Sequence, residues 1–446
     1  MIQLTLTYGS ITVNLMADGR IVLDGYYPEV SDDGNPVTDR FDVWASGTQA
    51  EIQASIAAIE LAFEHARQHP NDPDGCWINY ALTATDTTWR SRVLGGVVMH
   101  DARLDARMRQ GRALLGIAVT RQPFWEGAEE IVPLSNSNGT DVTTGLTVYN
   151  CNDGSGSAPN KLVNYVDIGA GVIDGNLPSP AKLIVKNTFA THRITSLWIG
   201  HNYTDPTNFV HLLEAEAATG VTPHSNSSCS GGNDVQATLS TDAKTDLLKW
   251  TLPITLLNAA RGRYVHAVVR FSNAVYIRQI RFSVRMGWNV TTIWESQAVL
   301  PDNDRAICIR DLSAFRLPPW LQSSAGLDAV DLVLSAQRLD PILMSLAIDC
   351  LMLIPADSFR TLQTTGYGVA QNSRIIDDGM TGDLYRDDGA GTGKVGIIRC
   401  FGGPIMLQPK KAQRLYFVTH SEYANTASIL HTLSIQVAYR PRRKTI

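Results

Sequence analysis

The chain has 446 residues, and at about 150 residues per domain this length predicts roughly three domains. Apolar residues make up 44% of the chain, charged residues make up 18%, and the formal net charge is −5 at pH 7. This composition excludes collagen-like and disordered classes, and it provides no broad cationic field for sequence-specific nucleic-acid binding. We therefore expect a soluble, β-rich protein of several domains.

The chain begins with a pattern that predicts a half-buried pair of strands. Between Ile2 and Leu15 apolar and polar side chains alternate, and Gly9-Ser10 interrupts the alternation at a turn. A period of two is typical of strands that have one buried face and one exposed face. The first element is therefore expected to be a hairpin.

One clear helix follows this hairpin. Thr48 and Glu51 have the spacing of a capping box, and apolar residues then recur at helical intervals until a His-Pro pair ends the run. Two longer strands are expected at 89–98 and 113–121. Residues 1–133 are thus predicted to form a β-sheet domain with one helix laid across the sheet.

The next segment changes in composition. Residues 135–139 read Ser-Asn-Ser-Asn-Gly, and residues 152–157 read Asn-Asp-Gly-Ser-Gly-Ser. Such a stretch buries too little apolar surface to fold by itself. Residues 134–180 are therefore expected to be a linker or crossover arm.

Residues 181–355 are predicted to form a β-sandwich of jelly-roll type, because short strands recur there and no long helical pattern is present. The strand that ends at Met286 shows the expected alternation: Ile280, Phe282 and Val284 point one way, and Arg281 and Arg285 the other. The strongest strand candidates are 182–186, 194–200, 264–271, 276–286, 330–334 and 345–354.

The last segment, residues 356–446, again contains strands, with candidates at 395–401, 414–418 and 429–439. They are too few for a full domain. Two arrangements are compatible with them. They either complete the N-terminal sheet, which would make the sandwich an insertion, or form a separate small β unit.

The sequence predicts neither a secretion signal nor a membrane-spanning segment. The first basic residue is Arg20, so no signal peptide is recognisable. The most apolar stretch, 342–354, contains Ser345 and Asp349 and is too short to cross a bilayer, so no membrane insertion is expected. The six cysteines lie far apart, which favours free thiols over a disulfide framework or a zinc site.

Two short motifs give only weak support for a phosphate site or a calcium site. Residues 391–396 match G-x-G-x-x-G, but no strand precedes them and no helix follows, so a hairpin tip is expected and not a phosphate site. The aspartates between Asp377 and Asp388 lack the spacing of an EF-hand loop, which favours a solvated loop over a calcium site.

A stronger pattern combines Glu214, Glu216 and Asp349. The two glutamates are expected on the same face of a strand, where like charges repel unless a cation or a basic group lies between them. Calcium accepts several oxygen ligands, and Asp349 is expected to join from a neighbouring strand. The alternative is that the glutamates are solvated or paired with the arginines of the sandwich.

This pattern resembles the calcium-stabilised carbohydrate-binding modules of jelly-roll type. In residues 205–355 the Glu-x-Glu pair is followed by Gly231-Gly232, and Asp349 lies on the expected last strand. The resemblance implies that Glu214, Glu216 and Asp349 hold a structural calcium and that aromatic side chains bind sugar. The chain departs from the family pattern after Gly232. The aromatic side chains that could stack on a sugar are Trp198, Trp250, Trp288, Trp294 and Trp320. The alternative for each of them is a buried position in the core.

A larger resemblance is to phage tail proteins, in particular the distal tail protein of siphophage baseplates. It rests on the order of elements over about 220 residues: the paired strands, the helix, Trp-Arg-Ser-Arg-Val-Leu-Gly-Gly-Val at 89–97, Pro-Phe-Trp-Glu-Gly at 123–127 and Val-Ala-Tyr-Arg-Pro-Arg at 437–442. The resemblance implies a ring-forming domain akin to the tail-tube fold, with a sandwich on its outside. It supplies no catalytic residues. The chain is longer than is usual for this family.

The function expected from these resemblances is that of a non-enzymatic virion protein, assembled in the host cytoplasm. It would form a tail ring (a hexamer, with a trimer as the alternative) that joins the tail tube to tail-tip or hub proteins. Its sandwich would contact other proteins or a host-surface glycan. One alternative is a carbohydrate-binding protein or a glycoside-active enzyme built on the sandwich. Another is a decorated tail-tube subunit.

Overall fold

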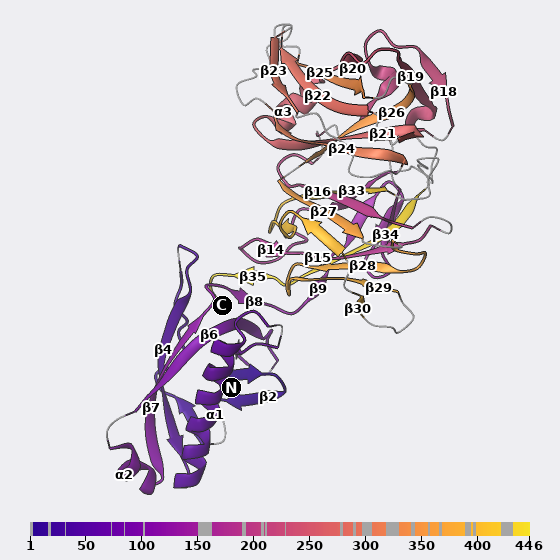
Figure 1. The fold of residues 1–446 in the computed structure, drawn as a ribbon. Coiled ribbons are helices and arrows are strands. Elements are labelled where there is room, and N and C mark those ends of the chain that lie inside the picture. Colours follow the sequence, from indigo (N-terminus) through magenta and orange to yellow (C-terminus); the bar gives the residue numbers. More distant parts are fainter. Residues whose placement is uncertain are drawn as a thin grey trace. The chain divides into compact units, whose positions relative to one another are not determined.

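The structure, a computed structural model, is mainly β, which confirms the expected fold class (Figure 1). The chain divides into two compact units. One comprises Met1–Glu130, Asp174–Ser179 and Arg440–Ile446, and the other comprises Ile131–Ile173 and Pro180–Tyr439. The described residues are 3–16, 19–31, 33–72, 74–83, 85–100, 103–149, 163–189, 193–206, 209, 212–227, 229–276, 280–288, 291–296, 306–317, 330–339, 344–355, 357–364, 368–388, 394–395, 398–420 and 431–446.

The first unit is built on one antiparallel sheet in the order β2-β1-β5-β6-β7-β4-β3. The expected N-terminal hairpin and the two longer strands are confirmed, and Gly9 has a positive φ at the hairpin turn. The strands are β1 (Gln3–Tyr8), β2 (Ile11–Asn14), β3 (Arg20–Val22), β4 (Val37–Ser46), β5 (Trp77–Ala81), β6 (Trp89–His100), β7 (Arg112–Arg121), β8 (Trp125–Glu126) and β35 (Arg442–Arg443).

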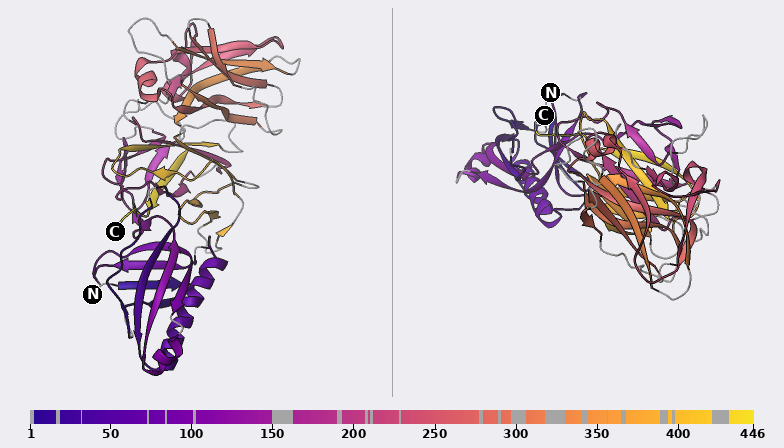
Figure 2. Two further views of the ribbon diagram at one scale, coloured as in Figure 1. Left: turned by 90° about the vertical axis from the view of Figure 1, so that its left-hand side faces the viewer. Right: turned by 90° about the horizontal axis from the view of Figure 1, so that it is seen from above.

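Helix α1 (Gln49–Gln68) lies along one face of this sheet (Figure 2). The expected capping box is present, because Thr48 and Glu51 each bond to the other's backbone N–H. Phe63 packs directly on β6 at Gly96, where a Cβ atom would come within 2.6 Å of the aromatic ring. A short second helix, α2 (Leu104–Arg109), has no side-chain cap, so no sequence signal marks it.

The last residues of the chain belong to the first unit. Strand β35 pairs with β8, and Arg442 donates from Nε and from an Nη atom to one oxygen of Glu126, at 3.0 and 2.6 Å. Arg443 lies 2.7 Å from Asp174, and Arg440 lies 3.7 Å from Glu129. Each arginine of the basic C-terminal cluster therefore has a carboxylate partner.

The second unit contains a sandwich of two facing sheets, ordered β11-β10-β13-β33-β16-β27-β31 and β12-β34-β15-β28-β29-β30, which share one apolar core. We call it the middle sandwich. Its strands are β9 (Glu130–Ile131), β10 (Leu134–Asn136), β11 (Gly139–Asp141), β12 (Leu146–Tyr149), β13 (Tyr165–Ile168), β14 (Ser179–Pro180), β15 (Lys182–Asn187), β16 (Ser196–Asn202), β27 (Ser358–Thr364), β28 (Arg374–Asp378), β29 (Asp383–Asp387), β30 (Lys394–Val395), β31 (Ile398–Phe401), β32 (Met406–Leu407), β33 (Gln413–His420) and β34 (Thr432–Tyr439).

The middle sandwich differs from the expected domain boundaries in two places. Parts of the expected linker, 134–149 and 163–180, contribute strands β10 to β14, and residues 150–162 lie outside the described part of the chain. Strands β15 and β16 pair with β28 and β27, not with the jelly-roll strands that follow them. These pairings join segments more than 150 residues apart, which local patterns do not reveal.

The jelly roll begins near Phe209 and is inserted between β16 and β27. Its sheets are ordered β18-β19-β26-β21-β24, with β17 also on β26, and β20-β25-β22-β23, and they enclose a large core. The helical elements are α3 (Ile254–Ala260), η1 (Ala215–Ala217) and η2 (Ser230–Gly232). The strands are β17 (Leu212–Glu214), β18 (Pro223–Ser225), β19 (Asn233–Leu239), β20 (Thr245–Thr251), β21 (Tyr264–Tyr276), β22 (Ile280–Trp288), β23 (Thr291–Glu295), β24 (Ala306–Arg316), β25 (Val330–Arg338) and β26 (Met344–Pro355).

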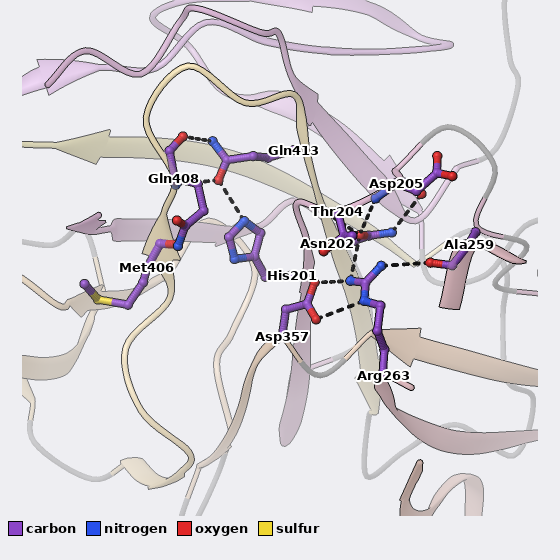
Figure 3. Close-up of polar contacts among 10 residues, drawn as sticks. All are labelled: His201, Asn202, Thr204, Asp205, Ala259, Arg263, Asp357, Met406, Gln408 and Gln413. Carbon is purple, nitrogen blue, oxygen red and sulfur yellow. Dashed lines mark hydrogen bonds and ion pairs between the residues drawn. The ribbon is translucent and has the colours of Figure 1, made fainter. Parts of the chain in front are cut away.

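Close contacts join the jelly roll to the middle sandwich. A Cβ atom on Gly200 would come within 2.0 Å of an Ile354 methyl group, so the backbone of β16 lies directly against β26. Trp198 and Tyr416, from β16 and β33, pack into the jelly-roll core. The two sandwiches therefore share a packed junction, whose polar contacts Figure 3 shows.

Candidate interaction surface and carboxylate cluster

The sheet face of the first unit that points away from α1 carries apolar side chains. Ile21 pairs with Trp44 and Trp44 with Leu114 across β3, β4 and β7, while Val97 and Met99 lie on the same face of β6. The exposed fractions of Ile21, Val97 and Met99 are 58%, 57% and 44%. No described residue covers these side chains. We call this the open face, defined by Ile21, Trp44, Val97, Met99 and Leu114.

The open face was not predicted from the sequence, although the sequence contains a signal for it. Residues 93–99 read Val-Leu-Gly-Gly-Val-Val-Met, with no polar residue at alternate positions. A strand that is apolar on both faces needs a partner on each side. The α1 side supplies one partner, and the open face has none within the part of the chain that the structure describes.

A buried network holds the β3–β4 connection beside this sheet. Arg121 and Asp39 are fully buried and form an ion pair, with Nε 2.5 Å from a carboxylate oxygen. Arg121 also donates to the carbonyl of Glu29 at 2.8 Å, and Tyr26 donates to Asp39. Burial and the Asp39 charge raise the pKa of Tyr26. The connection is thus fixed at its base, while Tyr27 projects from it with 80% of its surface exposed.

In the jelly roll, the structure brings Glu214 and Glu216 together over η2, but not on one strand as the sequence predicted. Strand β17 ends at Glu214, and Glu216 lies in the single turn η1. Both side chains lie over Gly231, where a Cβ atom would come within 2.6 Å of Glu216 Oε1 and 3.8 Å of Glu214 Cδ. Gly231 has a φ of 64°, a backbone conformation that favours glycine.

Asp349 lies beside these glutamates on β26 and is fully buried. Arg270 from β21, also fully buried, lies 2.5 Å from one of its oxygens, and the backbone N–H of Ser230 donates to the other at 2.8 Å. Burial raises the pKa of Asp349 to about 6, and the Arg270 charge opposes this rise. An arginine thus pairs with Asp349, whereas the alternative in the sequence analysis placed arginines beside the glutamates.

The cluster has features that fit a cation. Possible ligand atoms of Glu214, Asp349 and Cys350 lie within 4.8 Å of one another, close to the separation of opposite ligands around calcium, about 5 Å. Glu216 Oε2 is buried and accepts no hydrogen bond from the described residues. The charge of Glu216 also acts on Asp349 and, like burial, raises its pKa. Glu216 fits best, because Arg270 and the Ser230 N–H already engage Asp349, the Ser230 hydroxyl donates to Glu214 at 2.6 Å, and a thiol is a poor calcium ligand.

The tryptophans proposed as sugar platforms are mostly structural where the structure describes them. Trp198 is 7% exposed and Trp250 is 3% exposed. The Trp250 indole N–H donates to the carbonyl of Glu214 at 2.7 Å, so this side chain positions the carboxylate cluster. Trp294 stacks on Phe315. The Trp288 side chain and Trp320 lie outside the described residues.

The remaining sequence candidates have local roles or lie outside the described residues. Asp377 and Asp378 are buried on β28, and Asp377 pairs with Arg360 rather than lying in a solvated loop. Residues 391–393 are not described. Cys76, Cys229, Cys350 and Cys400 are free thiols. Among the described residues, no helix is both long enough and apolar enough to cross a membrane.

Comparisons with known proteins gave few matches. No protein-family model matches the chain, and no curated protein matches it. Two similar solved structures are those of the phage P2 baseplate in its activated conformation, one with Ca and one with Sr. Each match covers 77% of this chain and 99% of the matched baseplate chain, at 7% sequence identity. The TM-scores are 0.25 and 0.24. Scores this low do not establish a shared fold, so the function proposed below rests on the surfaces described above.

Proposed function

We propose that this protein is a structural, non-enzymatic component of a phage tail and that its first unit assembles with copies of itself into a symmetric ring. The open face carries the proposal. Monomeric proteins seldom expose contiguous apolar side chains of this size, and such patches mark interfaces. Fully burying an apolar side chain of this size contributes roughly 1.5–3 kcal/mol, so partner burial of Ile21, Val97 and Met99 would favour assembly.

A ring of copies fits this surface better than a single heterologous partner. Strands β2 and β3 end the sheet path, and neither has a further strand beside it among the described residues. Unpaired edges and an open sheet face are aggregation hazards, which a closed head-to-tail ring of identical subunits removes. The ring is proposed as a hexamer that joins the tail tube to tail-tip or hub proteins. The jelly roll would contact other tail proteins or a host-surface glycan.

The test is the mass of the purified full-length protein by light scattering, with negative-stain images of the same sample. We expect closed rings for the wild type and monomers for the double variant Val97→Glu, Met99→Glu, which puts two charges on the open face. Leu61→Glu is the matched control, because Leu61 is 60% exposed on the outer side of α1. Far-UV circular dichroism checks that all variants fold.

The outcomes separate the alternatives. A wild type that stays monomeric at high concentration would contradict the ring, and a double variant that assembles like the wild type would contradict the role of the open face in assembly. Hydrolysis of a glycan by that monomer would favour the glycoside-active alternative. Copy number in purified particles distinguishes a ring from a decorated tail tube, because a ring needs few copies and a tube needs many.

We further propose that Glu214 and Glu216, with Asp349 adjoining, hold a structural calcium in the jelly roll. The buried Glu216 oxygen that lacks a hydrogen bond favours this role. Calcium bound there would offset the repulsion between the glutamates and tie η1 to η2.

A further inference from the structure

A polar hollow of about 320 Å³ lies on the middle sandwich, where β10, β11 and β12 meet. Its lining residues are Asn138, Thr140, Asp141, Gly145, Leu146, Thr147 and Tyr149. The volume lies at the lower end of the range for small-molecule sites, about 300–1,000 Å³. The hollow thus has room for a ligand the size of one sugar ring.

The walls of the hollow offer uncharged hydrogen-bonding groups. The hydroxyls of Thr140, Thr147 and Tyr149 make no hydrogen bond within the part of the chain that the structure describes. Thr147 and Tyr149 lie two residues apart on β12, and both are half-buried on its outward face, whereas Leu146 and Val148 point into the core. A hydroxyl can donate and accept, as the hydroxyls of a sugar do.

The one carboxylate in the hollow is largely used by its own turn. Asp141 Oδ1 accepts from the backbone N–H groups of Thr144 and Gly145, each at 2.8 Å, and the Thr144 hydroxyl donates to Oδ2. These hydrogen bonds lower the pKa of Asp141, so it stays ionised at neutral pH. Because no lysine or arginine is among the described residues that line the hollow, an anionic ligand would meet this negative charge without compensation from them.

The hollow is also held in shape before any ligand arrives. The Asn136 side chain donates to the carbonyls of Thr147 and Tyr165, at 3.0 and 3.1 Å. It also accepts from the backbone N–H of Asn138 at 2.8 Å. Strand β12 pairs with β34 along its whole length. A site fixed in this way loses little conformational entropy when it binds.

We infer that this hollow binds a neutral pyranose unit of a glycan, with the Tyr149 ring against the sugar's C–H face and the threonine hydroxyls on its hydroxyl groups. The polar lining disfavours an apolar ligand, and Asp141 disfavours an anionic one. This inference deepens the glycan contact of the proposed function and rests on it. It moves that contact from the jelly roll to the middle sandwich.

The test is saturation-transfer NMR on the full-length protein with three probes: methyl α-D-glucopyranoside, methyl β-D-galactopyranoside and N-acetyl-D-glucosamine. We expect a signal from at least one neutral probe and none from D-glucuronate. Tyr149→Ala should weaken binding of that probe about tenfold, the size expected for loss of one aromatic contact. Tyr27→Ala, at an exposed tyrosine in the first unit, should leave binding unchanged.

Thr147→Val removes one hydroxyl with little change of shape, and it decides the result if Tyr149→Ala fails to fold. Absence of a signal from all three neutral probes would overturn the inference. Binding that survives both Tyr149→Ala and Thr147→Val would overturn it as well, and would point to the jelly roll instead. Light scattering on the same samples reports ring assembly separately, so failure of this site is distinguishable from failure of the ring.

Discussion

Arg263 binds Asp357 through both carboxylate oxygens, and the Nε–Oδ1 distance is 3.1 Å (Figure 3). The same guanidinium donates to Asn202 Oδ1 at 2.8 Å. Asn202 ends β16, just before the jelly roll, and Asp357 precedes β27, just after it. The Arg263 side chain therefore contacts both segments through which the backbone passes between the jelly roll and the middle sandwich.

Replacing Arg263 by Met should loosen this junction. The substitution leaves the largely buried carboxylate of Asp357 without its partner, which should lower the free energy of unfolding by about 3 kcal/mol. Urea unfolding measures this loss, and limited proteolysis should release a jelly-roll fragment sooner. Arg261→Met is the matched control, because Arg261 is exposed and, among the described residues, its side chain donates to Asn258 alone. Equal stability of the two variants would show that the junction does not depend on Arg263.

Calcium should stabilise the jelly roll through Glu214 and Glu216. At a free concentration of about 100 times Kd, a ligand that binds only the folded state adds about 2.7 kcal/mol. We therefore expect added calcium to raise the unfolding midpoint and EGTA to reverse the rise. The variant Glu214→Gln, Glu216→Gln should not respond, whereas Glu60→Gln, an exposed position on α1, should respond like the wild type. A wild-type midpoint that is the same in calcium and in EGTA would count against the site.

Acid should destabilise the middle sandwich through His201. This side chain is fully buried, its Nε2 lies 2.9 Å from Gln413 Oε1, and burial lowers its pKa to about 4. Because the unfolded chain binds the proton near pH 6.5, the stability from neutral His201 is present above that pH. It is lost as the pH falls toward 4, by roughly 3 kcal/mol in total.

The measurement is the free energy of unfolding between pH 4 and 7 for the wild type and for His201→Gln. The variant should show a flatter pH dependence in this window. His100→Gln is the control, because His100 is exposed at the end of β6. Identical slopes for the wild type and His201→Gln would rule out His201 as the titrating group.

Features encoded by neighbouring residues could be predicted from the sequence. The capping box at Thr48 and Glu51 and the hairpin turn at Gly9 depend only on residues close in the chain, and both are present. The pairing of β16 with β27 depends on residues more than 150 positions apart. A segment with strand pattern is compatible with either sandwich, so its partner is decided by packing that no local pattern describes.

The carboxylate cluster shows the same division. The proximity of Glu214, Glu216 and Asp349 was predicted from residue types, and the structure brings them together. The pairing of Asp349 with Arg270 was not predicted. Arginines within a strand were expected on its exposed face, as the half-exposed Arg281 and Arg285 of β22 are. Only the fold shows that Arg270 points inward. The open face was missed because an apolar run does not tell which of its two sides is covered.

The route of the chain between its two units has a mechanical consequence. The backbone passes from one unit to the other after Glu130, Ile173, Ser179 and Tyr439, so four peptide segments connect the units in parallel. A pulling force between the units would be shared among these four tethers. Because the chain is linear, a single cut at one tether leaves its two pieces joined by noncovalent contacts alone, such as the pairing of β8 with β35 within the first unit. After such a cut, the part of the molecule that carries the jelly roll would stay attached to the first unit for as long as those contacts hold.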